Sequence, residues 1–595
     1  MTEVSELSRR AFLATGAAAG AAALSPGVGL AQASARYRRL NVSNPQAARV
    51  LESYKRAITA MLKLLPTDPR NWYRLALIHT VDCPHGNWWF LPWHRGFIGW
   101  FEQICRELSD DPDFALPYWD WTQEPRVPQV MYDGVLTPTD PLYIGALSEF
   151  EAQYKDAVAR LDYWVSSPFD PNSQYGQLLA RGMRFPDDLW FDIGKDPRGL
   201  LFFDRAHARG LTKDKPEFDQ RTRDAASLAT LLNALAPRDF ITFGSPQTIA
   251  HSGLTGFGVL EGFPHNKVHN CVGGIFKDSN GMTTDVGGFM QANLSPVDPL
   301  FMLHHANIDR IWDVWTRKQQ ASNQPTLPSG VDASGNPIVD KWKSERFVFF
   351  VDNKGKPVTK TTAGDYAEIG EFNYDYEPGS GEEVVPVRVA AAPAPPVERF
   401  EVTETGGRLT LPAALLRSAQ NAPPPRLFAK VTLDLPPSAH QGVSVDIDGT
   451  TFDLSMFGHH TIQAPVTFTL PLTAPLANRN NTLNFSVASS HGHAAGGSHE
   501  RTRKSGGAVN CGRAALNSPR CTTIHYILLW SPPHCSASLG SSAIRAVRER
   551  RNQHSSRESN WYCRDRLLPA KPSGWKFGSE HLGAATSRSA RATGG

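Results

Sequence analysis

The sequence predicts a mainly helical domain, followed by a small all-β domain and a basic tail without regular structure. Three observations predict this order. Apolar residues recur with helical spacing between about residues 44 and 315. Alternation with a period of two residues follows between about 431 and 470, with turn residues between the strand-like runs. Beyond about residue 490 both periodicities end, and Arg, Ser and Gly dominate.

Length and composition agree with this organisation. A chain of 595 residues is long enough for several domains. Its hydrophobic fraction of 41% and aromatic fraction of 10% are typical of a globular protein with a sizeable core. The net charge of +3 gives no indication of a nucleic-acid partner, and we expect none.

The first 33 residues predict an export signal. A twin arginine, Arg9-Arg10, precedes an Ala- and Gly-rich apolar run, and Ala31-Gln32-Ala33 provides a small-residue cleavage site. The run is too short and too Gly-rich for a stable membrane span, which disfavours a membrane anchor. We therefore expect residues 1–33 to be a Tat signal peptide. The mature protein would be periplasmic or secreted, without a membrane partner.

Residues 34–376 carry the helical pattern, and we expect a four-helix bundle core with large loops, because long Pro- and Gly-rich connections separate the helices. Asn44-Pro45 and Asp298-Pro299 are cap and first-position pairs that begin helices. In the second helix Trp72, Leu75 and His79 share one face. The five expected helices cover residues 44–65, 68–79, 92–108, 259–270 and 298–315.

The rest of the chain divides into three parts. Residues 377–397 are rich in Pro, Gly and Ala and predict an exposed linker. Residues 398–490 predict the β-domain, with strands at 431–435, 443–447 and 466–470. Residues 491–595 have an excess of Arg and Lys and predict a disordered tail, or the product of a shifted reading frame. The three cysteines before the tail are too scattered for a disulfide framework: Cys83, Cys105 and Cys271.

Histidines gather in two clusters. His265 and His269 stand four residues apart, so they project from one helical face and can share a metal ion, with His305 from another helix as the third ligand. His79 and His94 come from two further helices, and His85 from the loop between them. A single histidine in such a place is more often a packed core residue. Two triplets among apolar neighbours instead predict a dinuclear metal site.

The residue types narrow the choice of metal. Imidazole without carboxylate suits copper, zinc, iron and nickel. The sequence contains neither an HExxH motif nor thiolate pairs at zinc spacing, which disfavours zinc.

Longer motifs around the histidines resemble a known family. The stretch His85-x4-Phe-Leu-Pro-Trp-His94-Arg-x2-Ile98-x3-Glu102 resembles the first copper signature of the tyrosinase, catechol oxidase and haemocyanin family, with Ile98 as a mild departure. The stretch 298–309, DPLFMLHHANID, is similar to the second signature without a departure. The motifs PYWDW at 117–121 and YDY at 374–376 are also similar to family motifs, so the resemblance covers about 37–376. The β-domain resembles the C-terminal domain of polyphenol oxidase proenzymes.

The resemblance implies two copper ions in a type 3 site and chemistry with dioxygen on a phenolic or catecholic substrate. It assigns His79, His85 and His94 to copper A and His265, His269 and His305 to copper B, and it leaves His304 beside the metal. Cys83 resembles the cysteine that some members link to histidine as a thioether. Glu261 and Asn266 match a pair that holds a water for deprotonating a monophenol. Ala292 takes the place of a bulky residue at the substrate mouth, and Phe457 is the candidate plug of a lid formed by the β-domain.

Four functions can be weighed on these residues. The expected one is ortho-hydroxylation of monophenols together with oxidation of o-diphenols to o-quinones. A catechol oxidase without hydroxylase activity is the nearest alternative. A haemocyanin-like oxygen carrier is disfavoured by the export signal and the single copper domain, and a copper store would not need the aromatic residues Trp88, Trp89, Phe90 and Trp93.

Overall fold

The computed structural model describes residues 35–191, 193, 203–274 and 287–386, and further along the chain 398–401, 403–404, 408–410, 426–433, 442–454, 465–472, 482–490 and 527–531. All of these belong to one compact unit, Met1–His534. The expected signal peptide and Phe457 lie outside the described residues. Among the helices described, none has the length and apolar character needed to cross a membrane.

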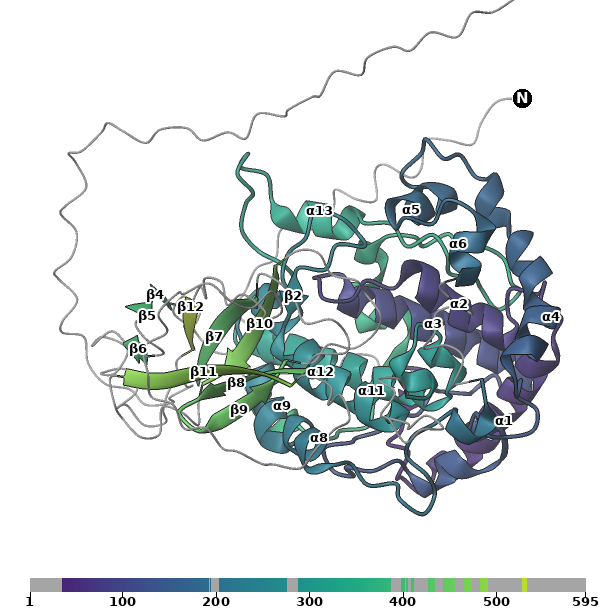
Figure 1. The fold of residues 1–595 in the computed structure, drawn as a ribbon, viewed down its shortest axis with the longest axis horizontal. Coiled ribbons are helices and arrows are strands. Elements are labelled where there is room, and N and C mark those ends of the chain that lie inside the picture. Colours follow the sequence, from purple (N-terminus) through teal and green to yellow (C-terminus); the bar gives the residue numbers. More distant parts are fainter. Residues whose placement is uncertain are drawn as a thin grey trace, which may run out of the picture. The chain divides into compact units, whose positions relative to one another are not determined.

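The region up to residue 386 is mainly helical, as predicted (Figure 1). Its longest helices are α1 (Ala47–Lys63), α3 (Phe90–Ser109) and α12 (Leu300–Ala321), and α3 packs against both α1 and α12. Helix α2 (Trp72–Asp82) lies between α1 and α3 in the sequence. Shorter helices follow the loops between them: α4 (Leu147–Ala159), α5 (Gln174–Ala180), α6 (Pro186–Trp190), α8 (Gln220–Ala225), α9 (Leu228–Leu235), α10 (Phe240–Phe243), α11 (Asn266–Gly273) and α13 (Ile338–Ser344).

Helix α2 begins four residues later than the sequence pattern suggested. Asn71, and not Asp68, is its N-cap, because the Asn71 side chain accepts hydrogen bonds from the backbone N–H groups of Tyr73 and Arg74 at 3.0 and 3.3 Å. Asp68 instead binds the side chain of Arg70. Every residue of α2 is buried, so the helix runs through the core. Its last turn lies beside one of the two histidine groups described below.

A buried network of charges joins α3 to α12. The Arg95 guanidinium on α3 donates to Asp309 on α12 at 2.6 Å, and Arg39 donates to Glu102 on α3 at 2.8 Å and lies 3.5 Å from Asp309. Tyr376, in the short strand β3 (Tyr374–Tyr376), donates to the same Asp309 carboxylate at 2.7 Å. Removing one partner of such a buried pair typically costs about 3–5 kcal/mol. The network therefore fixes the two helices against each other.

The expected helix 259–270 is interrupted. Residues Glu261–His265 form a π-helical turn, and α11 starts only at Asn266. Pro264 lies inside the turn and has no N–H group to donate to a carbonyl one turn earlier, which accounts for the change of helix type.

The strands after residue 397, together with β2 (Gly256–Phe257) from the helical region, form two five-stranded sheets, in the orders β2-β10-β7-β12-β4 and β5-β6-β11-β8-β9. The strands expected at 431–435, 443–447 and 466–470 correspond to β7, β8 and β10. The strands are β2 (Gly256–Phe257), β4 (Glu398–Glu401), β5 (Thr403–Glu404), β6 (Arg408–Thr410), β7 (Arg426–Leu433), β8 (Gly442–Ile447), β9 (Thr450–Asp453), β10 (Val466–Pro471), β11 (Thr482–Ser490) and β12 (Ile527–Ser531); β1 (Tyr37–Arg39) pairs with β3 near the start of the chain.

Two expectations about the later chain differ from the structure. The first part of the expected linker is packed on the helical region, because Glu377 accepts from the Asn41 N–H at 2.8 Å and Glu382 pairs with Arg317 at 2.9 Å. The other difference is β12, which pairs with β4 and β7 although it lies within the expected structureless tail. Its Ile-Leu-Leu-Trp run is the apolar segment that can pair there.

Candidate metal centre

Two buried groups of potential metal ligands lie in the helical region. Within each group, one ligand atom from every residue lies within 4.8 Å of the others, and every side chain is buried. The groups are His79, Cys83, His85 and His94, and His265, His269, His304 and His305. The structure thus brings together all six histidines that the sequence analysis selected.

The two groups face each other. The rings of His94 and His305 stack with their centroids 4.0 Å apart and their planes 4° from parallel. The centroids of His85 and His265 lie 5.9 Å apart. Because α3 carries His94 and α12 carries His305, the charge network between these helices also sets the separation of the two groups.

Backbone carbonyl groups orient three of the imidazoles through Nδ1. His94 donates to the Phe90 carbonyl in its own helix at 2.8 Å. His79 donates to the Asn293 carbonyl and His269 to the Met290 carbonyl, each also at 2.8 Å. A carbonyl oxygen only accepts, so each Nδ1 carries the proton and each Nε2 keeps a lone pair. This is the tautomer that a metal ion requires.

Burial keeps these imidazoles neutral. Desolvation lowers the pKa of His94, His269 and His305 well below the usual range, and each neighbouring histidine lowers it further. The pKa of His265 falls to about 3 for the same reason. Metal binding requires deprotonated imidazole, so these residues need not release protons when they bind an ion near neutral pH.

Cys83 lies between two histidines of its group. Its Sγ is 3.5 Å from Nε2 of His85 and 3.4 Å from Nε2 of His94, and it forms no disulfide. Burial raises the pKa of the thiol well above its ordinary value. The thioether to His85 stays a prediction.

Glu261 and Asn266 flank the second group. The Glu261 carboxylate accepts from the Gly86 N–H at 2.7 Å and from the Ser245 hydroxyl, and burial raises its pKa to about 8. The Asn266 side-chain oxygen accepts from Nδ1 of His265 at 2.9 Å. Asn266 therefore orients a histidine of the site, and its amide nitrogen, which has no hydrogen-bond partner among the described residues, is left to donate.

His304 lies closer to the second group than the sequence analysis expected. It belongs to the same cluster of ligand atoms, and its ring stacks on that of His265 with centroids 5.3 Å apart. Distance alone does not separate it from His305. The assignment of His305 as the ligand therefore stays a prediction that rests on the signature.

Ala292 lies between the two carbonyl groups that orient histidines. It follows the short helix η7 (Phe289–Gln291), and Met290 and Asn293 on either side of it accept from one histidine of each group. Its side chain is partly exposed. Its place at the substrate mouth stays a prediction, and the candidate plug Phe457 lies outside the described residues.

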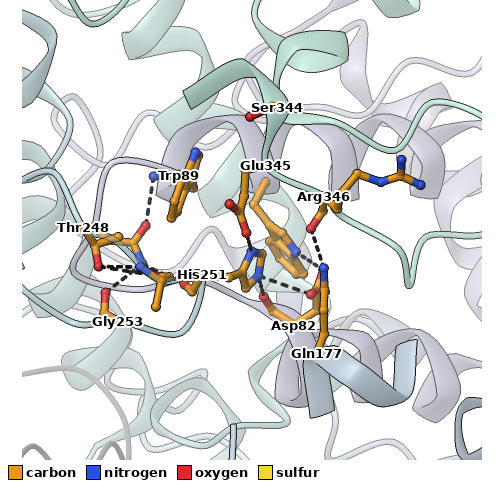
Figure 2. Close-up of polar contacts among 12 residues, drawn as sticks. Asp82, Trp89, Gln177, Thr248, His251, Gly253, Ser344, Glu345 and Arg346 are labelled. Carbon is orange, nitrogen blue, oxygen red and sulfur yellow. Dashed lines mark hydrogen bonds and ion pairs between the residues drawn. The ribbon is translucent and has the colours of Figure 1, made fainter. Parts of the chain in front are cut away.

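The sequence analysis missed a largely buried histidine beside the first group. His251 lies between Asp82 and Glu345, 3.2 Å from the Asp82 carboxylate and 3.0 Å from that of Glu345 (Figure 2). Ser245 and the carbonyl groups of Met290 and Asn293 were also missed. No spacing in the sequence distinguishes a loop histidine or a backbone carbonyl of this kind, so the sequence could not predict these contacts.

The geometry defines the class of this protein. Two facing groups of buried imidazoles, four of which are oriented through Nδ1, form a centre for a pair of metal ions that prefer nitrogen ligands.

Comparisons with known proteins show what the helical region is similar to. Residues 69–318 match the common central domain of tyrosinase. Chloroplastic polyphenol oxidase from Spinacia oleracea is 26% identical over 353 residues, which cover 55% of this chain and 45% of the relative. Tyrosinase HcTyr1 from Hahella sp. (strain CCB-MM4) is 26% identical over 363 residues, covering 55% and 60%. Residues 69–318 thus match a domain that tyrosinases and polyphenol oxidases share, and that domain is a dinuclear copper domain.

The matches are partial. This chain spans about half the length of the curated relatives it matches. Among solved structures, latent apple tyrosinase is similar with a TM-score of 0.45 and 17% identity over 77% of this chain and 95% of that chain. The tyrosinase from Burkholderia thailandensis has a TM-score of 0.41 and 19% identity, covering 77% and 94%.

Proposed function

We propose that the protein is an exported copper oxidase that hydroxylates monophenols at the ortho position and oxidises o-diphenols to o-quinones. The observation that carries the proposal is the pair of facing histidine groups, with His79, His85 and His94 as ligands of one copper and His265, His269 and His305 as ligands of the other. The copper pair would supply the electron transfer between dioxygen and the phenol. The protein supplies the fixed imidazoles, a water-poor site and a place for the proton.

Glu261 and Asn266 would handle that proton. A phenol has a pKa of about 10 and needs a base to ionise near neutral pH. A water that accepts from the Asn266 amide nitrogen and donates to the Glu261 carboxylate would be held near His265, where it can take the proton of the phenolic hydroxyl. Ser245 and the Gly86 N–H keep the carboxylate in place while it does so.

Oxygen uptake with a panel of phenols tests the proposal. Oxidation of two catechols to o-quinones transfers four electrons and reduces one dioxygen to two waters. Hydroxylation and oxidation of one monophenol consume one dioxygen and release one water. The expected ratio of dioxygen to substrate is therefore 1:2 for 4-methylcatechol and 1:1 for a monophenol without an amine group, such as 4-methylphenol. Uptake with catechol alone would identify a catechol oxidase, and reversible oxygen binding without turnover would identify a carrier.

The relatives leave the choice between the two activities open. They include polyphenol oxidases and, at 28% identity over 283 residues, a (+)-larreatricin hydroxylase from Larrea tridentata. Glu261 and Asn266 support the hydroxylase for this chain.

The β-domain would act as a lid. Its strand β9 contacts the segment that carries the second histidine group, because Asp453 pairs with Lys267 at 3.3 Å and the rings of Phe452 and Phe263 lie 6.1 Å apart. Lys267 stands between His265 and His269 in the sequence, so the lid would be attached directly to the copper B segment. Release of the lid after cleavage in 387–397 would open the site to bulky phenols.

A further inference from the structure

The loop that carries His85 is held by a segment far away in the sequence. Gly86 accepts at its carbonyl from the N–H groups of Thr255 and Gly256, at 2.9 and 3.0 Å. The Asn87 side chain donates to the carbonyl groups of His251 and Gly253, each at 3.1 Å. The segment around His251 is therefore a wall of the first histidine group.

The side chain of His251 is a cation for geometric reasons. Its Nε2 lies 2.7 Å from the Asp82 carbonyl, which only accepts, so Nε2 carries a proton. Its Nδ1 lies 3.0 Å from the Glu345 carboxylate, which also accepts. Both ring nitrogens therefore donate, and the ring is an imidazolium between two carboxylates (Figure 2). These carboxylates raise the pKa of His251 to about 9, although burial and the nearby Arg181 act in the opposite direction.

Asp82 connects His251 to the residues of the first group. It is the last residue of α2, directly before Cys83 and the loop with His85. Its other carboxylate oxygen accepts from the Trp93 indole N–H at 2.6 Å. The Trp93 ring packs against His94, with centroids 4.9 Å apart, and against His79, with centroids 5.9 Å apart. Neither Asp82 nor Trp93 has a described ring or hydrogen-bond contact with the second group.

We propose that His251 is a positioning residue for the first metal ion: its imidazolium holds Asp82, and through Asp82 the Trp93 ring and the His85 loop, in the geometry that binds copper A. Arg181 completes the cluster, because its guanidinium donates to the Asp82 and Cys83 carbonyl groups. Two cations and two carboxylates then balance each other in the buried site. The proposal rests on the metal site alone and is independent of which phenols the enzyme oxidises.

Copper content tests the proposal. Loss of a group that orients metal ligands typically weakens metal binding about 10- to 100-fold. We expect His251→Gln, dialysed against a chelator that leaves the wild type with two coppers, to retain about one. His207→Gln is the matched control, because His207 also pairs with an aspartate, Asp204, but lies at the surface, and it should retain two. Two coppers in a folded His251→Gln protein would overturn the proposal.

Double variants show which copper is lost. In a His305→Ala background, which weakens the second group, adding His251→Gln should remove the remaining copper. In a His94→Ala background, which weakens the first group, adding His251→Gln should not change the copper content. A further loss in the His94→Ala background would mean a general structural role and would overturn the proposal.

A pH profile gives a readout if His251→Gln does not fold. Glu345→Gln keeps the imidazole but removes one carboxylate facing it, so His251 should lose its proton at a lower pH. We expect the wild type to lose one copper as the pH rises through about 9 in a glycine buffer, and Glu345→Gln to lose it at lower pH. Coincident profiles would overturn the proposal.

Discussion

In four of the histidines, a single hydrogen bond from Nδ1 decides which ring nitrogen faces the metal. His94 carries its proton on Nδ1 because the Phe90 carbonyl accepts it, and His305 stacks on the ring of His94 at 4.0 Å. We expect His94→Ala and His305→Ala each to reduce copper from two to about one per chain and to abolish phenol oxidation, since a copper with two nitrogens left is weakly held. Metal analysis and oxygen uptake measure both. Full copper and catechol turnover in His305→Ala would instead favour His304 as the ligand.

Loss of Glu261 or Asn266 should affect a monophenol substrate more than a catechol substrate. Glu261→Gln and Asn266→Ala should lower the kcat/KM for a monophenol about 100-fold, the lower range for loss of a general base, and that for a catechol far less. A catechol is more easily deprotonated on a metal, so it depends less on a protein base. Ser245→Ala is the control, because it keeps the Glu261 carboxylate but removes the hydroxyl group that donates a hydrogen bond to it. Equal losses on both substrates would show that the pair only supports the fold.

The raised pKa of His251 predicts a pH dependence of stability. The pKa is about 9 in the folded protein, above the ordinary value of 6.5. A raised pKa means that the stabilisation is complete below about 6.5 and is lost as the pH rises through 9. We expect the melting temperature of the copper-free protein to fall between pH 7 and 10, and the fall to be much smaller in His251→Gln. Parallel curves for the two proteins would contradict this assignment.

Contacts between elements attach the β-domain to the second histidine group. Asp453 in β9 pairs with the buried Lys267 in α11 and with Arg221, whose side chain is 73% exposed. We expect Asp453→Asn to loosen the β-domain and to raise activity on bulky phenols severalfold, with little change for small catechols. Arg221→Ala is the control, because an exposed ion pair contributes only about 0–1 kcal/mol. No gain with Asp453→Asn would argue against a lid held by this contact.

The existence of the helices could be predicted from the sequence better than their limits. The apolar period identified the segments of α1, α3 and α12, because burial of one face produces it. In α2 the period marked only part of the buried surface, because every residue of this helix is buried. The start of α2 was wrong because Asp68 and Asn71 are both good caps, and only the folded chain shows which one meets free N–H groups. The π-helical turn at Glu261–His265 was missed because Pro264 can be tolerated in several ways.

At the scale of the whole molecule, the boundary of the helical region lies further along the chain than predicted. Ser380 donates to Asp120 at 2.7 Å, and Glu377 and Glu382 bind Asn41 and Arg317. We expect a protein that ends after Pro386 to fold and bind two coppers, and one that ends after Tyr376 to melt several degrees lower. Thermal unfolding and metal analysis compare them. Equal melting temperatures would show that these contacts contribute little.

The candidate site could be predicted more completely than its surroundings. Six histidines in two triplets have a spacing that the sequence displays. His251, Ser245 and the carbonyl of Met290 act across loops of irregular conformation, and their contacts depend on tertiary folding alone. The strand β12 was missed because five apolar and polar residues within a basic stretch give too short a pattern to distinguish from chance.

The turn that contains Ala292 works as a spacer for the dinuclear centre. Met290 and Asn293 each fix one histidine from opposite groups, and three peptide units separate them. Such a stretch reaches at most about 11 Å. The distance between the two halves of the centre is thus limited by bond lengths in one short peptide, which thermal motion of the surrounding helices cannot stretch.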